Sequence, residues 1–264
     1  MEYRYPHFRR ELMVEDMRFA GGPRPGERFP AFDLPTTDGK RVRSSDYQGR
    51  PLLITLGSST CPMTASAGPL LKRLYDEFGE RVGFLMLYVR EAHPGEYYPQ
   101  PATFQQKVEH ARVYKKRDDI PWDVAVDDLD GSLHRVVDPK PNAAYILDPD
   151  GIVVLRTLWS NYEPPLRDGL KAVAAGMAPA DGDREPRLVP MLRGVGQMDE
   201  ILSFAGGYAR TDVLRQVPPI YAVARLASGF RPLPPLACST LAMIVMVATV
   251  GGIAMTVRRA AHAG

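Results

Sequence analysis

Short, uninterrupted apolar runs alternate with amphipathic stretches through the first two thirds of the chain. An Asp-Gly signal at 36–40 predicts a hairpin between strands at 29–35 and 41–43, followed by a single helical turn at 45–49. Apolar runs of strand length predict further strands at 52–56, 82–89, 122–126, 143–147 and 152–155. Apolar residues at helical spacing predict helices at 65–78, 103–116, 132–137 and 165–175. This order predicts an α/β fold with a central mixed sheet flanked by helices.

Changes in composition divide the chain further. The segment 188–235 is partly amphipathic and is broken by Gly206-Gly207 and Pro218-Pro219. Its apolar residues would either pack on the α/β domain or lie in a membrane interface, and both placements stay open. We expect an extension at 1–24 to which the pattern assigns no function, the α/β domain at 25–177, a linker at 178–187, the helical segment at 188–235, a membrane-spanning helix at 236–257 and a basic tail at 258–264.

The segment 236–257 has the length and composition of a membrane span. It holds 22 residues without a charge and is followed by Arg258 and Arg259. About 20 apolar residues cross a bilayer as a helix, whereas a buried helix of a soluble protein is the alternative. We therefore expect a single-pass C-terminal anchor in a membrane. Because the N-terminus shows no secretory signal, we expect the α/β domain on the cytoplasmic side.

Charge and cysteine content exclude several classes of function. The formal net charge of the 264 residues is only +2, and no basic run is interleaved with aromatic residues, so we expect no nucleic-acid partner. Two distant cysteines, Cys61 and Cys238, do not form a disulfide framework. This usage is typical of a protein kept in a reducing compartment.

Cys61 lies where an apolar strand is expected to turn into a helix. Unpaired backbone N–H groups and the helix dipole at such a position stabilise a thiolate, which favours a nucleophile. The alternative is a small, buried, unreactive side chain. The adjacent hydroxyls of Ser58, Ser59 and Thr60 are candidates for hydrogen bonds to the sulfur, and Thr60 is also a candidate N-cap of the helix.

Several motifs carry a family resemblance. FPAFDLPTTDGKRVRSSDYQGRPLLITLGSSTCP (29–62) and AAYILDPDG (143–151) resemble the thioredoxin-like superfamily, in its alkyl hydroperoxide reductase/redoxin branch. Within that branch, GSSTCP, FLMLYVREAHP and PWDVAVDDLDG are similar to iodothyronine deiodinases and their bacterial relatives. The resemblance covers about 150 residues, from 26 to 175. It implies a thioredoxin-like fold.

The resemblance also implies roles for individual residues. Cys61 falls where deiodinases hold their catalytic selenocysteine, and His93 falls on the histidine of their E-A-H-P segment, which implies a role beside the chalcogen. Glu91 would orient His93 or face solvent. Pro141 is the candidate for the proline that the thioredoxin fold sets opposite the cysteine, with Asn142 as the other candidate, and a cis bond is not predicted. We expect Cys61, His93, Thr60 and Glu91 to be catalytic, and Ser58, Ser59, Pro141 and Asn142 to bind substrate.

The chain also departs from the family pattern. Ser59 stands where deiodinases generally carry a second cysteine, and Thr64 stands where a thioredoxin has its resolving thiol. The peroxiredoxin pattern is half met, since Ile54 replaces its proline. The second histidine of the deiodinases has no match within 100–104. His110, further along, is expected to be exposed on a helix.

These residues predict a thiol-dependent oxidoreductase that uses one cysteine. Cys61 would attack a peroxide oxygen, a disulfide sulfur or a halogen of a small molecule or thiol/disulfide substrate. Cys238 lies in the predicted membrane span, so an external thiol such as glutathione or thioredoxin would reduce the enzyme, without a bound cofactor. A one-cysteine peroxidase and a non-catalytic thioredoxin-fold binding module at the membrane are the alternatives. A copper or zinc site with Cys61 and His93 is a minor one, and no metal is predicted.

Overall fold

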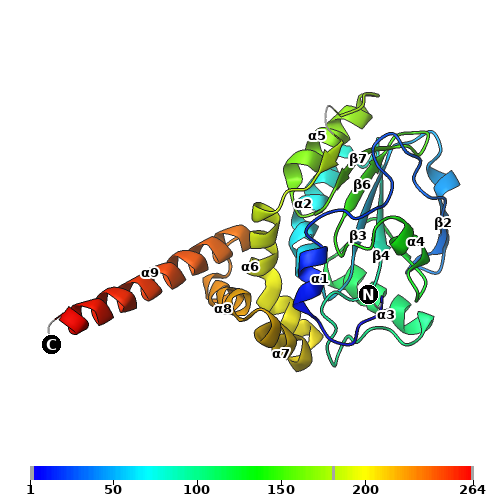
Figure 1. The fold of residues 1–264 in the computed structure, drawn as a ribbon. Coiled ribbons are helices and arrows are strands. Elements are labelled where there is room, and N and C mark those ends of the chain that lie inside the picture. Colours follow the sequence, from blue (N-terminus) through cyan, green and yellow to red (C-terminus); the bar gives the residue numbers. More distant parts are fainter. Residues whose placement is uncertain (1–2, 180–181, 263–264) are drawn as a thin grey trace.

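A six-stranded mixed sheet forms the centre of the computed structural model, which describes residues 3–179 and 182–262, the last thirteen by their backbone alone (Figure 1). The strand order is β5-β4-β3-β6-β7-β8. Strands β4 and β5 run parallel to β3, whereas β6 is antiparallel to both β3 and β7. The strands are β3 (Leu52–Gly57), β4 (Gly83–Tyr88), β5 (Asp123–Val126), β6 (Ala144–Leu147), β7 (Val153–Thr157) and β8 (Asp183–Arg184).

Alternating side chains of the central strands fill two separate hydrophobic layers. In β4, Phe84, Met86 and Tyr88 face one layer, and Leu85 and Leu87 face the other. Both faces are apolar because both are covered, as the continuous run predicts. The first layer is closed by α2 (Pro62–Phe78), α3 (Phe104–Arg117) and α5 (Glu163–Ala174). The second is closed by the segment around β1 (Asp33–Pro35) and β2 (Arg41–Arg43), by η1 (Ser44–Tyr47) and by the region of α4 (Ser132–Val136).

The path of the chain through this sheet is that of the thioredoxin fold. A parallel β3-α2-β4 unit is joined, through α3, β5 and α4, to the antiparallel hairpin β6-β7 and the closing helix α5. The predicted fold class is therefore confirmed for the α/β domain. The predicted hairpin at 36–40 is also confirmed. The predicted helix at 103–116 is α3, and its N-cap is Thr103, whose side chain accepts from the backbone N–H of Gln106.

The C-terminal helices pack on the α/β domain. They are α6 (Leu188–Ala205), α7 (Gly207–Gln216), α8 (Pro218–Ala227), η2 (Ser228–Phe230) and α9 (Pro235–His262). We call residues 188–230 the helical module. Helix α6 lies along α2, so closely that a Cβ at Gly194 would lie 2.3 Å from the Met63 sulfur. Of the two placements left open by the sequence, the structure therefore shows packing on the domain.

The predicted span at 236–257 lies partly beyond the side chains that the structure describes. Among the residues whose side chains the structure describes, no single helix has the length and hydropathy of a membrane span. One bent pair, Pro218–Phe230 with Pro235–Thr249, meets that test jointly, with an angle of 115° between its halves. Figure 1 shows α9 extending away from the rest of the protein. The single-helix anchor is thus not confirmed.

The N-terminal extension is an integral part of the fold. Its helix α1 (Arg10–Glu15) lies between the α/β domain and the helical module (Figure 1). Tyr5, Phe8 and Leu12 are buried in one cluster with Leu202 and Val213 of the module. The backbone N–H of Phe8 and the imidazole of His7 both bond to the Asp212 carboxylate of α7. The extension that the sequence left without a function therefore joins the two halves of the molecule.

Candidate functional site

Cys61 lies at the turn from β3 into α2. It is the N-cap residue of α2, with an extended backbone, and Pro62 begins the helix. Its thiol is 1% exposed. Burial raises the pKa of Cys61 to about 11, although hydrogen bonds from the Thr64 side chain and from the backbone of Thr64 and Met63 favour the thiolate. The expected donors at the helix N-terminus are thus present, but burial outweighs them, and the resting group is a neutral thiol.

The Thr64 hydroxyl is oriented toward Cys61 by Asn142. The amide Nδ2 of Asn142 donates to Thr64 Oγ1 over 3.2 Å and to the carbonyl of Leu56 over 3.3 Å. With its oxygen accepting from Asn142, the Thr64 hydroxyl has its proton free for the Cys61 sulfur. Asn142 Oδ1 in turn accepts from the backbone N–H of Ser160. Asn142 therefore supports the thiol from behind rather than lining the space in front of it.

His93 is buried beside the same space. Its imidazole is stacked on the Phe8 ring, with 4.4 Å between the centroids and 37° between the planes. Its Nδ1 is a buried nitrogen without a hydrogen-bond partner among the described residues. Burial lowers the pKa of His93 to about 4, so the ring is neutral at physiological pH. A buried nitrogen without a protein partner carries a desolvation cost that a hydrogen bond would relieve.

The buried state of His93 predicts a pH-dependent stability. An unfolded histidine takes up its proton near pH 6.5, whereas folded His93 does so near pH 4. The contribution of the neutral ring to the free energy of unfolding is therefore complete above pH 6.5 and is lost as the pH falls to 4. Relative to His93→Gln, the unfolding free energy of the wild type should fall by about 1.4 kcal/mol per pH unit across this window. Urea unfolding of both proteins at several pH values measures the difference, and a pH-independent difference would contradict it.

Glu91 is the centre of a buried hydrogen-bond network behind Cys61. One carboxylate oxygen accepts from the Ser59 hydroxyl at 3.1 Å and from the hydroxyl and backbone N–H of Thr60 at 2.7 and 3.2 Å. The other accepts from the Tyr88 hydroxyl at 2.5 Å and from Nδ1 of His110 at 3.1 Å. Burial alone would raise the pKa of Glu91, but the bonds from His110, Tyr88 and Thr60 and the charge of His110 together lower it.

This network corrects three expectations. Glu91 neither faces solvent nor bonds His93 in the structure, because it holds the loop before Cys61. Thr60 is not the N-cap of α2, since its hydroxyl donates to Glu91 and accepts from the backbone N–H of His93. His110 is buried rather than exposed. The buried positions of α3 recur at helical spacing, which includes His110, and this periodicity was the available signal.

The remaining predicted residues take different places. The Ser58 hydroxyl accepts from the backbone N–H of Ala92, and the Ser59 hydroxyl donates to Glu91. The hydroxyl that bonds the Cys61 sulfur is that of Thr64. Pro141 lines the space in front of Cys61. The peptide bond that precedes it is trans. Within residues 3–179 and 182–249, no three His, Cys, Asp or Glu side chains lie close enough together to hold a metal ion.

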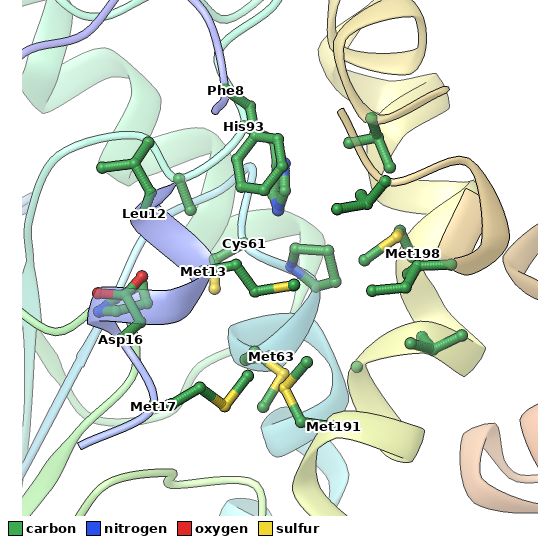
Figure 2. Close-up of a pocket in the computed structure, with 18 of the residues that line it drawn as sticks. Phe8, Leu12, Met13, Asp16, Met17, Cys61, Met63, His93, Met191 and Met198 are labelled. Carbon is green, nitrogen blue, oxygen red and sulfur yellow. The ribbon is translucent and has the colours of Figure 1, made fainter. Parts of the chain in front are cut away.

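A small, mainly apolar cavity lies in front of Cys61 and His93 (Figure 2). Its volume is about 70 Å³. The α/β domain contributes Cys61, Met63 and His93, the extension contributes Phe8 and α1, and the helical module contributes the opposite wall. The wall residues from the extension and the module are Tyr5, Phe8, Leu12, Met13, Asp16, Met17, Met191, Gly194, Val195, Met198, Val213, Val217 and Ile220. Sequence reasoning missed all of them.

Comparison with known proteins identifies the family. The iodothyronine deiodinase family matches residues 6–148, more than half of the chain. The chain belongs to this family. It is 35% identical to the type II iodothyronine deiodinase of Sus scrofa over 68 residues, which are 25% of each chain. It is 40% identical to that of Homo sapiens over 47 residues, 18% of this chain and 17% of the relative. The match spans about a quarter of these relatives or less.

Solved structures with a similar chain path include two thiol-disulfide oxidoreductases. The protein from Bacteroides fragilis is 20% identical, with a TM-score of 0.39 over 49% of this chain and 89% of its own. The thioredoxin domain from Bacteroides vulgatus is 16% identical, with a TM-score of 0.40 over 50% and 86%.

The deiodinase match has two consequences for the site. It includes most of the N-terminal extension, so the segment that carries Phe8 and Asp16 belongs to the family region. It ends at residue 148, so the helical module that forms the opposite wall lies outside it. Cys61, Glu91, His93 and His110 all fall within the matched residues.

Proposed function

We propose that this deiodinase-family chain is a thiol-dependent oxidoreductase in which Cys61 is the single nucleophile. One observation carries the proposal: a thiol and a neutral imidazole with an unpartnered nitrogen line one cavity. The network around Glu91 fixes the loop that presents the thiol. Neither arrangement is needed for packing alone, because an apolar side chain fills such a space at lower cost.

The proposed chemistry is removal of a halogen from an aromatic carbon. The Cys61 sulfur attacks the halogen and the C–X bond breaks, so that the carbon receives the bonding electrons and a proton. The products are the dehalogenated ring and a Cys61 sulfenyl halide, in which the sulfur has been oxidised. His93 lies beside the sulfur and offers its unpartnered Nδ1 to the reacting group.

A thiol from outside the chain completes the cycle. The first thiol displaces halide from Cys61 and forms a mixed disulfide, and a second thiol releases Cys61 as a thiol together with the external disulfide. Cys238 is the other cysteine of the sequence. It is buried in a separate cluster with Val195 and Ala224, where its thiol donates to the carbonyl of Leu233. Cys61 lies in a different hydrophobic cluster, so we take the resolving thiol to be an external one.

The proposal is tested by following Cys61 directly. The full chain is exposed to an iodinated phenol, a dialkyl disulfide and hydrogen peroxide in separate reactions, and the mass of the peptide that contains Cys61 is recorded before and after added glutathione. With one equivalent of glutathione per chain, which stops the cycle at the mixed disulfide, we expect the iodinated phenol to give a glutathione adduct on Cys61 and free iodide in equal amounts. Absence of any adduct on Cys61 with all three reagents would reject the assignment.

A second candidate function is reduction of a small peroxide, and the cavity volume favours it. At about 70 Å³ the cavity is well below the size of typical ligand pockets, so it suits a hydroperoxide better than a two-ring substrate. In that reaction the Cys61 sulfur attacks the terminal oxygen, the O–O bond breaks, and the products are a sulfenic acid and an alcohol or water. Formation of a sulfenic acid on Cys61 by peroxide, without iodide release from the phenol, would select this candidate.

We also propose that the exposed apolar surface of α9 contacts a membrane. Met243, Ile244, Val245 and Val247 are exposed within little more than one turn and point in different directions around the helix, which suits lipid more than a single partner surface. The full chain should float with liposomes, and Val247→Asp should reduce the bound fraction several-fold. Val136→Asp, an equally exposed valine of α4, is the matched control and should bind as the wild type does. Equal flotation of both variants would contradict this proposal.

A further inference from the structure

The cavity holds a nucleophile that needs a proton acceptor. A thiol must lose its proton to attack, since the thiolate is the reactive form. Burial keeps Cys61 protonated near neutral pH and keeps His93 neutral. The Tyr5 hydroxyl, also on the cavity wall, donates to the carbonyl of Ala92 and is therefore engaged. None of these three groups is suited to take up a proton and return it at neutral pH.

Asp16 is the one charged residue among the cavity's lining residues. It caps the C-terminal end of α1, where its backbone N–H donates to the carbonyl of Leu12. Figure 2 shows Asp16 on the α1 side of the cavity, to the left of Cys61. In the described part of the chain no hydrogen bond engages this carboxylate. The carboxylates of Asp138 and Asp212, by contrast, accept from the backbone N–H groups of Ala20 and Phe8. An unengaged carboxyl group on an apolar wall is free to exchange a proton with the cavity.

The charges around Asp16 place its titration in the useful range. Burial raises the pKa of Asp16 to about 7, and Arg90 and Lys140 lower it, while Glu15 and Asp138 raise it. Its charge also acts on Cys61 and on Tyr5, whose pKa values it raises. A group that titrates near the working pH serves equally well as acceptor and as donor.

We propose that Asp16 is the proton acceptor and donor for Cys61. As the sulfur attacks, the S–H bond breaks and its proton passes to the Asp16 carboxylate. When the bond to the leaving group breaks, the same proton passes from Asp16 to the carbon or oxygen that has received the bonding electrons. Asp16 therefore ends the reaction with the electrophile in the protonation state in which it began. The inference rests on the proposed reactivity of Cys61, and it adds a catalytic residue from the N-terminal extension.

The test is the rate at which iodoacetamide alkylates Cys61, followed by mass spectrometry of the Cys61 peptide in the full chain from pH 5 to 10. We expect the wild-type rate to rise with a midpoint near pH 7. In Asp16→Asn this rise should be absent, and the rate at pH 7.5 should fall by about 10²-fold. Asp16→Glu should retain a rise in the same region. Glu11→Gln, which removes an exposed carboxylate from the same helix, is the matched control and should follow the wild type.

The sign of the effect separates proton transfer from simple electrostatics. If Asp16 acted only as a nearby negative charge, its removal would lower the pKa of Cys61 and accelerate alkylation. A faster Asp16→Asn variant, an unchanged one, or a wild type that does not react at any pH would each overturn the proposal. Alkylation needs no natural substrate. A wild type that alkylates as expected but turns over none of the three electrophiles would therefore reject the proposed function alone.

Discussion

Replacing Cys61 with serine is expected to abolish thiol-dependent turnover of the electrophile that the full chain reduces. A serine hydroxyl at this position keeps the size of the side chain, but it stays protonated and cannot form a sulfenyl or disulfide intermediate. We expect a loss on the order of 10³-fold or more in kcat/KM, as for removal of a nucleophile in other enzymes. Consumption of the thiol reductant in the presence of substrate measures it.

Cys238→Ser is the matched control for this experiment. Cys238 is buried, and its thiol donates to the Leu233 carbonyl, a bond that a serine hydroxyl also makes. This variant should keep the wild-type rate, because Cys238 lies in a different hydrophobic cluster from Cys61. Turnover that survives in Cys61→Ser, or that disappears in Cys238→Ser, would show that the nucleophile has been assigned to the wrong residue.

The second large effect is expected at Glu91. Glu91→Ala removes a fully buried carboxylate that accepts hydrogen bonds from Ser59, Thr60, Tyr88 and His110. The donors left behind are buried without an acceptor, so the unfolding free energy should fall by about 3–5 kcal/mol. Glu91→Gln keeps one acceptor oxygen and most of the shape, and it should lose less. Chemical denaturation of the three proteins at pH 7 measures both values.

Acid should reproduce part of this loss. The pKa of Glu91 is lower in the folded chain than its usual 4.5, so its contribution to stability is complete above pH 4.5 and is lost as the pH falls through the folded value. The part of the acid-side slope that arises from Glu91 below pH 4.5 should therefore be absent in Glu91→Gln. Glu109→Ala removes an exposed carboxylate from the same helix as His110, and it should change stability by less than about 0.5 kcal/mol. A comparable loss in Glu109→Ala would contradict a role for burial.

The sequence was most informative where local pattern and tertiary structure agree. The strands, the helices and the hairpin of the α/β domain follow from apolar periodicity and turn residues, because each element buries the face that its pattern indicates. The position of Cys61 at a strand-to-helix turn follows in the same way. The properties of the site could not be predicted in this way. The pKa of Cys61 depends on how deeply the thiol is buried, and the residues near it in sequence do not determine that burial.

The missed residues are those brought in from the two ends of the chain. Phe8 and Asp16 lie in a segment with short helical structure and few apolar repeats, and Val213 and Ile220 lie in helices whose apolar faces have several possible partners. Their contact with Cys61 and His93 depends on long-range packing. Thr64 and Tyr88 were missed for another reason, since they look like ordinary core positions of a helix and a strand until their hydroxyl partners are known.

Because the cavity wall draws on residues as far apart as Phe8 and Ile220, the order of synthesis matters for the thiol. A nascent chain that has emerged only as far as α5 already contains every strand from β3 to β7 around Cys61, but it lacks the wall that α6, α7 and α8 provide. Domains fold as they leave the ribosome, N-terminal part first. For the time needed to make about 50 further residues, at 5–20 residues per second, Cys61 is open to any oxidant in the compartment where translation takes place. The helical module is thus the last part of the cavity wall to be synthesised, and Cys61 is covered only when synthesis is nearly finished.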